Sequence, residues 1–401
     1  MRGKVDRVRP RPGLGLATGR LHEFLSSFGP AWIVMIADVD APSILTAATV
    51  GALYGYGLAW FFVALIVPLF VIQEVSGRIG IATGRGLGEL IRISYSRRTA
   101  VLATLPVAVV DVVSYVAEYT GIAIGMELVG VLPIVSMPLA YAAHILIVRR
   151  RNYVRIEKLL FAISTVLILS YAGSLLTRGF SSAGSFYLSA SPSFLFILAA
   201  SAGAVVMPFM LFYQASATAE KGGGRMWAMR TETFVGAVAS EAGMIVIMMA
   251  TAGLSSSVNF ASPKVLSQAL VTIADSYAPE LFALGLVAAA FLALVVISLG
   301  SSWAVVEAMG WKKDNFFWVY VAESVPAVAV PIFYPDPLGL VLGMMVAFVF
   351  ALAGPGILMG KLASDKRVMG EFASGTLLKA AYWASLAAVL GFGVLALVAS
   401  V

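Results

Sequence analysis

The feature that most constrains this chain is a succession of apolar segments, most of them long enough to cross a lipid bilayer. Hydropathy indicates about 11, near residues 29–54, 57–81, 99–127, 132–148, 156–177, 192–217, 229–253, 281–308, 315–334, 337–360 and 374–400. Inside a bilayer every backbone polar group needs a partner within the protein, so such segments fold as helices. The sequence predicts an all-α polytopic membrane protein, with a short interfacial helix between residues 260 and 280.

Composition agrees with this class. The chain is 60% hydrophobic and 12% charged, whereas a soluble domain carries roughly 25% charged residues. There is no cysteine, which excludes disulfides, thiolate metal clusters and thiol nucleophiles. The two histidines, His22 and His144, are too far apart to indicate a histidine metal site, and His144 is interpreted as structural.

The basic residues predict the orientation. Of the 27 lysines and arginines, 25 fall in the N-terminal tail and in alternate loops, leaving Arg178 and Lys264 on the other side. The positive-inside rule then predicts a cell-membrane protein with a cytoplasmic N-terminus and an external C-terminus. Residues 1–28 form a basic cytoplasmic tail without signal-peptide features. The net charge of +6 therefore reflects topology and lipid contact, not nucleic-acid binding. Glu74 is expected to pair with an arginine.

The first and sixth segments are interrupted near their middle by a proline beside a candidate metal ligand. The first break reads Asp40-Ala41-Pro42-Ser43, and the second runs from Gly203 to Met207-Pro208. Proline removes a helical hydrogen bond, and in lipid the freed carbonyl groups need new partners. A carboxylate at one break and a thioether at the other indicate that the missing partner is a cation.

The positions of the breaks predict an internal repeat. Because the first segment starts inside and the sixth starts outside, residues about 29–177 and about 192–360 form two five-helix units of opposite orientation. Transporters of this kind bind substrate near the bilayer midplane, between discontinuous helices in corresponding positions. Residues about 374–400 form an extra helix, and residues 29–401 one transmembrane transporter domain.

The candidate metal ligands follow from the two breaks. Asp40 supplies charge, and Ser43 lies three residues later on the same helix face. Unwound backbone at Ala41 and Ala204 is expected to add carbonyl oxygens. Met207 adds a soft sulfur, which favours transition metals over Mg²⁺ or Ca²⁺. We therefore expect a divalent metal ion as the substrate, without a cofactor and without catalytic residues.

Three further acids are candidates for a supporting or proton-carrying role. Asp38 lies two residues before Asp40 and would face away from the site on a regular helix, although unwinding could bring both acids to one ion. Asp111 and Glu118 are seven residues apart on the third segment and share a face. Purely structural roles remain open for all three.

Several stretches resemble the Nramp family of divalent-metal transporters, in family order and over nearly the whole chain. They are Gly29 to Ser43 with Gly51 to Tyr56 in the first helix, Gln73 to Gly84 in the second, Ala117 to Gly121 in the third, Gly203 to Pro208 in the sixth and Met369 to Phe372 before the eleventh. The resemblance implies a LeuT-like 5+5 inverted repeat and import of Mn²⁺ or Fe²⁺, usually with protons.

The chain also departs from the family pattern. The family's Asp-Pro-Gly-Asn is Asp40-Ala-Pro-Ser43 here, Phe209 replaces a histidine, and Asp-Leu-Ala-Glu has become Tyr115-Val-Ala-Glu118. Positions that are polar in the family's eighth and tenth helices carry apolar residues in this chain. The family's proton route is thus largely lost, which weakens the case for proton coupling. It leaves open a second interpretation, an uncoupled Mg²⁺ transporter of the Nramp-related type.

Other classes fit less well. In an amino-acid carrier of this architecture, Asp40 would repel the substrate carboxylate. An intramembrane enzyme would need a nucleophile with its base or a metal motif, and the sequence has neither His-Glu-x-x-His nor Gly-x-Ser-x-Gly. A scaffolding protein would leave the two matching breaks unexplained. A channel would conduct ions without saturation at low concentration, whereas uptake by a carrier saturates.

Overall fold

The computed structural model describes residues 29–149, 186–222, 224–256, 258–260, 262–273, 276–334 and 338–399, with shorter pieces between 159 and 176. Side chains of 338–346, 396 and 399 are not described. The predicted tail, residues 1–28, and most of the predicted fifth span lie outside the described residues.

The described chain is helical throughout, as predicted. Its helices are α2 (Pro30–Ile36), α3 (Ala41–Tyr54), α4 (Ala59–Thr83), α5 (Leu87–Ser94), α6 (Arg97–Leu128), α7 (Pro133–Arg149), α9 (Pro192–Val205), α10 (Pro208–Lys221), α11 (Met226–Thr251), α12 (Pro263–Ile273), α13 (Ala278–Met309), α14 (Phe316–Phe333), α15 (Leu338–Ser364), α16 (Lys366–Met369) and α17 (Thr376–Ala399). Two short 3₁₀ turns, η1 (Lys313–Asn315) and η2 (Gly370–Phe372), lie between them.

Length and apolarity identify the membrane spans. Among the described residues, 8 helices can cross a membrane when α9 and α10 are taken as one span, and the bent pair α2–α3 makes a ninth. The shorter apolar helix α7 occupies the predicted fourth span. The remaining predicted span is the fifth, which the described pieces cover only in part. Helix α12 occupies the stretch where a short helix was expected.

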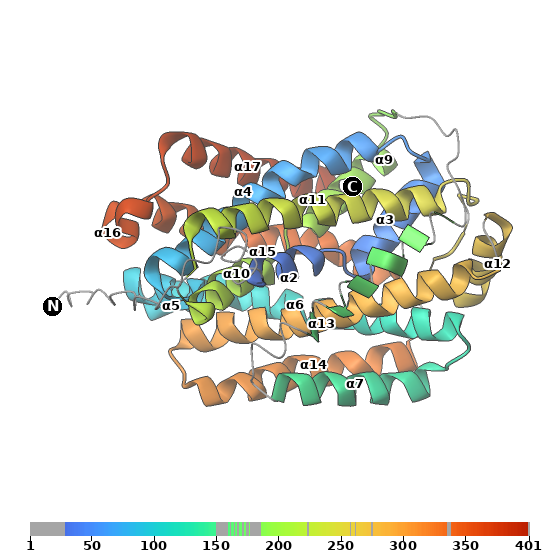
Figure 1. Ribbon diagram of the computed structural model, residues 1–401, viewed down its shortest axis with the longest axis horizontal. Coiled ribbons are helices and arrows are strands. Elements are labelled where there is room, and N and C mark those ends of the chain that lie inside the picture. The colour runs from blue at the N-terminus through green and yellow to red at the C-terminus, as the bar shows by residue number, and fades with distance from the viewer. Residues whose placement is uncertain are drawn as a thin grey trace, which may run out of the picture.

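The long helices run side by side along the long axis of the molecule (Figure 1). Helices α6 and α13 pack extensively against each other in the centre, and α7 and α14 cover one edge. At the other edge, α4 packs on α11 and α10. The halves of the broken segments lie within this bundle, so their surroundings are protein.

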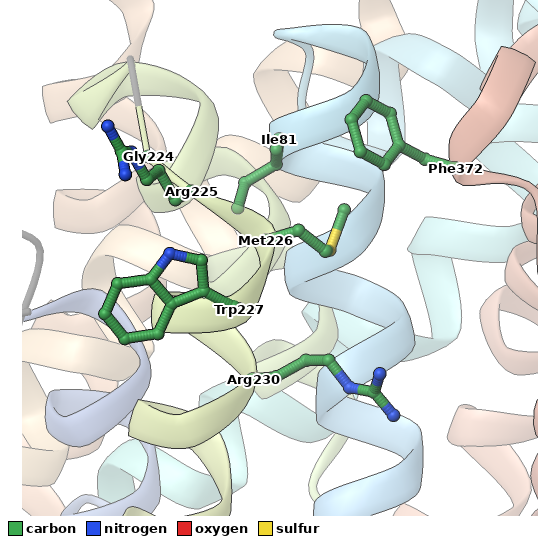
Figure 2. A pocket seen from close by; sticks show the side chains of 7 residues that line it. All are labelled: Ile81, Gly224, Arg225, Met226, Trp227, Arg230 and Phe372. Atoms are coloured by element: carbon green, nitrogen blue, oxygen red, sulfur yellow. The ribbon is translucent and has the colours of Figure 1, made fainter. Parts of the chain in front are cut away.

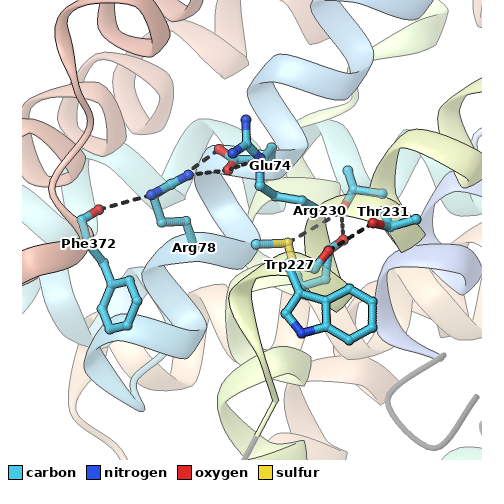
Figure 3. A network of polar contacts seen from close by, with 8 residues as sticks. Glu74, Arg78, Trp227, Arg230, Thr231 and Phe372 are labelled. Atoms are coloured by element: carbon cyan, nitrogen blue, oxygen red, sulfur yellow. Dashed lines mark hydrogen bonds and ion pairs between the residues drawn. The ribbon is translucent and has the colours of Figure 1, made fainter. Parts of the chain in front are cut away.

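Polar contacts join the loops at one end of the bundle, where α5 and α16 lie (Figure 1). Glu74 on α4 is buried and forms ion pairs with Arg78 on the same helix and, at 3.3 Å, with Arg230 on α11. Arg78 also donates a hydrogen bond to the carbonyl oxygen of Phe372 (Figure 3). Lys313 pairs with Glu220. The prediction that Glu74 pairs with an arginine is confirmed.

A cavity of about 610 Å³ opens beside this network. Its walls come from the end of α4, the start of α11 and η2, and Trp227 and Arg230 line it (Figure 2). Neither break contributes to its lining, so the substrate-site prediction does not rest on it.

Candidate metal site

The first break separates α2 from α3 with a bend of 48°. Asp40 is the N-cap of α3, and its Oδ1 accepts a 2.8 Å hydrogen bond from the backbone N–H of Ser43. One oxygen of the Asp40 carboxylate thus caps the N-terminus of α3, as the side chain of an N-cap residue commonly does. Asp40 Oδ2 and Ser43 Oγ are buried and have no hydrogen-bond partner among the described residues. One carboxylate oxygen and one hydroxyl therefore remain for a cation.

The second break lies between α9 and α10. Val206 and Met207 are non-helical, and Met207 is the N-cap of α10, with 1% of its surface exposed. In a continuous helix the carbonyl of Ala204 would accept the N–H of residue 208, but Pro208 has none. The end of α9 therefore offers an unclaimed carbonyl next to a buried thioether.

The two breaks lie at the same level of the bundle. Helix α2 packs against α10, and α3 packs against α9. The first half of each broken segment thus contacts the second half of the other, which is the pairing expected of antiparallel segments. The four half-helices thus enclose both breaks in protein, and the meeting of the predicted ligands at one ion stays a prediction.

The backbone state of two predicted ligands needs correction. Ala41 and Ala204 were expected in unwound backbone, but both are helical: Ala41 begins α3, and Ala204 lies in the last turn of α9. Pro42 causes the first difference, because proline within the first turn of a helix costs no hydrogen bond and favours helix initiation there. Ala41 presents its N–H, which donates at 3.1 Å to Glu118 Oε2.

Glu118 on α6 reaches the first break. Besides the bond to Ala41, its carboxyl interacts with that of Asp40, and its Oε1 has no donor within the described chain. Gly121 lets α6 come this close: a Cβ there would lie 2.2 Å from the Cβ of Ala41. Glu118 therefore contacts the candidate site directly, as its role as a supporting acid requires.

The other two candidate acids contact different elements. Asp38 Oδ2 accepts a 2.8 Å hydrogen bond from Ser240 Oγ on α11. Asp111 lies beside Ser301 on α13, which donates at 3.0 Å to Glu323 on α14. Asp38 also interacts electrostatically with Asp40, whereas the contact of Asp111 is with α13.

His144 makes two hydrogen bonds, with Tyr119 at 2.9 Å and with Ser298 at 2.8 Å. Both ring nitrogens are therefore satisfied, as expected, and the structural role of His144 stays a prediction. In the part of the chain that the structure describes, no three His, Asp or Glu side chains come together as metal ligands. A metal at the breaks would thus be held by a mixed set of carboxylate, hydroxyl, carbonyl and thioether.

Sequence reasoning missed one acid that acts on the first broken segment. Glu232 on α11 accepts hydrogen bonds from the backbone N–H groups of Gly29 and Trp32, at the start of α2. Its only sequence signal is that it is one of two carboxylates, with Glu241, inside an apolar segment. Such a signal does not reveal a helix terminus about two hundred positions away in the chain.

An enclosed helical bundle with two paired, interrupted spans defines a multi-pass membrane protein of the inverted-repeat transporter class. The family model described as natural resistance-associated macrophage protein-like matches residues 31–399. The chain therefore belongs to the Nramp family.

Known relatives agree in sequence and in fold. The chain is 27% identical over 391 residues to the divalent metal cation transporter MntH of Klebsiella pneumoniae subsp. pneumoniae, covering 91% of this chain and 92% of the relative. The crystal structure of the Eremococcus coleocola manganese transporter with an aromatic bis-isothiourea compound has a TM-score of 0.76 at 14% identity, covering 95% and 88%. MhsT in complex with L-phenylalanine has a TM-score of 0.64 at 13% identity, covering 96% and 99%. The predicted LeuT-like fold is thereby confirmed.

Proposed function

We propose that this chain imports divalent metal ions of the Mn²⁺ and Fe²⁺ class by alternating access around the two breaks. The observation that carries the proposal is the pairing of α2 with α10 and of α3 with α9. This pairing supports a site in which the Asp40 carboxylate and the buried Met207 thioether hold the same ion. Family membership and the names of the relatives support the same substrate class.

The ligand set would be Asp40, Ser43, Ala204 and Met207. Asp40 contributes the charge, Ser43 Oγ and the Ala204 carbonyl contribute oxygens without other partners, and Met207 contributes sulfur. Thioethers select softer transition metals over Mg²⁺ and Ca²⁺, which prefer oxygen. Ala41 remains a weaker candidate, because its carbonyl lies in the first turn of α3.

The second candidate is an uncoupled Mg²⁺ transporter. Phe209, at the start of α10, is fully buried and cannot exchange protons. Ser43 has a short side chain, which favours contact with the ion through a water molecule. Met207 argues against Mg²⁺, because a thioether gains little from an ion that keeps its water.

We also propose that the basic loops face the cytoplasm. The described loops that carry most of these residues gather at the α5 and α16 end of the bundle (Figure 1). In this orientation α2 and α10 are the cytoplasmic halves of the broken spans, and α3 and α9 the external halves.

Purified protein in liposomes tests the proposal. We expect saturable uptake of Mn²⁺, faster than uptake of Mg²⁺, and little change of an internal pH dye. Asp40→Asn keeps a helix-capping oxygen but removes the charge, so it should abolish uptake without unfolding the protein. Glu280→Gln, an exposed substitution on α13, is the matched control. Mg²⁺ uptake without Mn²⁺ uptake would favour the second candidate, and uptake that survives Asp40→Asn would refute the site.

A further inference from the structure

A second pair of buried acids lies beside the first break, on the side of α11. Asp38, in the non-helical segment, has 1% of its surface exposed, and Glu241 and Ser240 on α11 are fully buried. Ser240 donates to Asp38 Oδ2, and the Asp38 and Glu241 carboxyls are close enough to repel each other. Asp38 Oδ1 and both oxygens of Glu241 have no hydrogen-bond partner in the described chain.

The described surroundings provide no positive charge for this pair. The side chains that interact with Asp38 are Ser240, Glu241 and Asp40, all neutral or acidic. Arg230 is on the same helix as Glu241 but lies on the order of 15 Å from it by helical rise. Arg230 instead pairs with Glu74. A buried carboxylate without a partner is costly, so the pair must be neutralised, either by protons or by a cation.

The number of free oxygens indicates which ion. One proton shared by the two carboxyls leaves a negative charge behind, and two protons neutralise both acids but bind only two of the three free oxygens. A divalent cation neutralises both acids and can coordinate all three free oxygens, together with a lone pair of Ser240. The carbonyl of Asp38 is a further donor, because its helical partner would be the missing N–H of Pro42.

The metal-binding atoms of this second site are all oxygens. Such a set selects hard cations, in contrast to the first set with its thioether. We propose that Asp38, Ser240 and Glu241 form a second cation site, for a hard divalent ion such as Mg²⁺ or Ca²⁺, which ties the unwound segment to α11. The ion bound there stabilises the break through α11, whereas Glu118 contacts it from α6, and this ion is distinct from the transported ion.

Thermal unfolding with the Asp40→Asn variant tests the second site apart from the first. With the transport site neutralised, titration with Mg²⁺ or Ca²⁺ should still raise Tm in a saturable manner, because ligands that bind the folded state stabilise it. Adding Glu241→Gln should abolish the shift, and adding Glu280→Gln should leave it unchanged. Equilibrium dialysis with radioactive Ca²⁺ should find one ion per chain in Asp40→Asn and none after Glu241→Gln is added.

Ser240→Ala keeps both acids and provides a milder test if Glu241→Gln fails to fold. It should lower the apparent affinity for the divalent ion at least tenfold. Three results would overturn the proposal: no divalent-dependent shift in Asp40→Asn, a shift that survives Glu241→Gln, or stabilisation by Na⁺ or acid alone. None of these measurements requires transport, so failure of Mn²⁺ import in liposomes is a separate outcome.

Discussion

The Glu232 carboxylate on α11 accepts a 2.6 Å hydrogen bond from the backbone N–H of Gly29, at the start of α2. The N–H of Trp32 donates to the same oxygen at 3.0 Å. A carboxylate at this position satisfies otherwise free N–H groups and complements the positive end of the helix. Because α2 has only 7 residues, this one side chain holds a large part of it against α11. Movement of α2 away from α11 must break both bonds.

Removal of this contact should therefore open α2, the first half of the first broken span. Glu232→Ala leaves buried N–H groups unsatisfied, which costs the closed position about 1–3 kcal/mol. The chain has no cysteine, so Ala31→Cys on buried α2 provides a single reporter. We expect it to react faster with a membrane-impermeant maleimide, added on the side of the membrane that the α5 end of the bundle faces, in Glu232→Ala than in the parent.

Glu232→Gln serves as the matched variant, because an amide oxygen can still accept both bonds but carries no charge. Its labelling rate should fall between those of the parent and Glu232→Ala. Equal rates in all three proteins would show that the contact does not hold α2 in place.

The ion pairs around Glu74 should contribute unequally to stability. Glu74 is fully buried and Arg78 nearly so, whereas the Arg230 side chain is 52% exposed (Figure 3). Glu74→Gln leaves the charge of Arg78 buried without its partner, at a cost of about 3–5 kcal/mol. Arg230→Gln removes an exposed charge, at a cost of about 0–1 kcal/mol. Thermal unfolding in detergent should show this order, and a larger loss for Arg230→Gln would contradict it.

Close packing of α6 against the first break predicts a sharp size limit at Gly121. In Gly121→Ala the new Cβ would lie 2.2 Å from the Cβ of Ala41, so α6 and α3 must separate. Overpacking of this kind costs about 1–3 kcal/mol, and here it also pulls Ala41 from Glu118. We expect a lower Tm and at least tenfold weaker Mn²⁺ binding by calorimetry.

Gly243→Ala on α11 is the control for this substitution. The nearest heavy atom to its Cβ would be 3.7 Å away, which is ordinary contact. Alanine in a helix interior is more stable than glycine by about 0.5–1 kcal/mol, so Tm should hold or rise. Because the nearest atoms belong to Val39, in the first break, a loss equal to that of Gly121→Ala would show that any added side chain beside the break is harmful, and not the overlap with Ala41 in particular.

Sequence patterns predicted the elements of this fold better than the contacts between them. Apolar length and the two prolines identified the spans and the breaks, because lipid leaves the backbone few alternatives. The same prolines did not reveal that Ala41 would be helical, since a proline near a helix start and one in an unwound segment look alike. Contacts such as Ser240 with Asp38 and Glu232 with Gly29 join residues about 200 positions apart, and helical periodicity carries no information on such pairs.

The thioether at the second break should determine metal preference. If Met207 contacts the transported ion, Met207→Ala removes the soft ligand and leaves oxygens from Asp40, Ser43 and Ala204. Uptake of Cd²⁺ and Mn²⁺ should then fall, and uptake of Ca²⁺ or Mg²⁺ should fall less or rise. Competition of these ions against Mn²⁺ uptake in liposomes measures the preference of each variant for one ion over another.

Met207→Leu separates ligation from packing. Leucine has a similar volume, so exchange in a buried position usually costs less than about 1.5 kcal/mol. The two variants should show the same change of metal preference, although Met207→Leu should keep a higher Tm. If Met207→Leu discriminates between Cd²⁺ and Mg²⁺ as the parent does, the sulfur of Met207 only fills space, and the selectivity of the site must come from its oxygens.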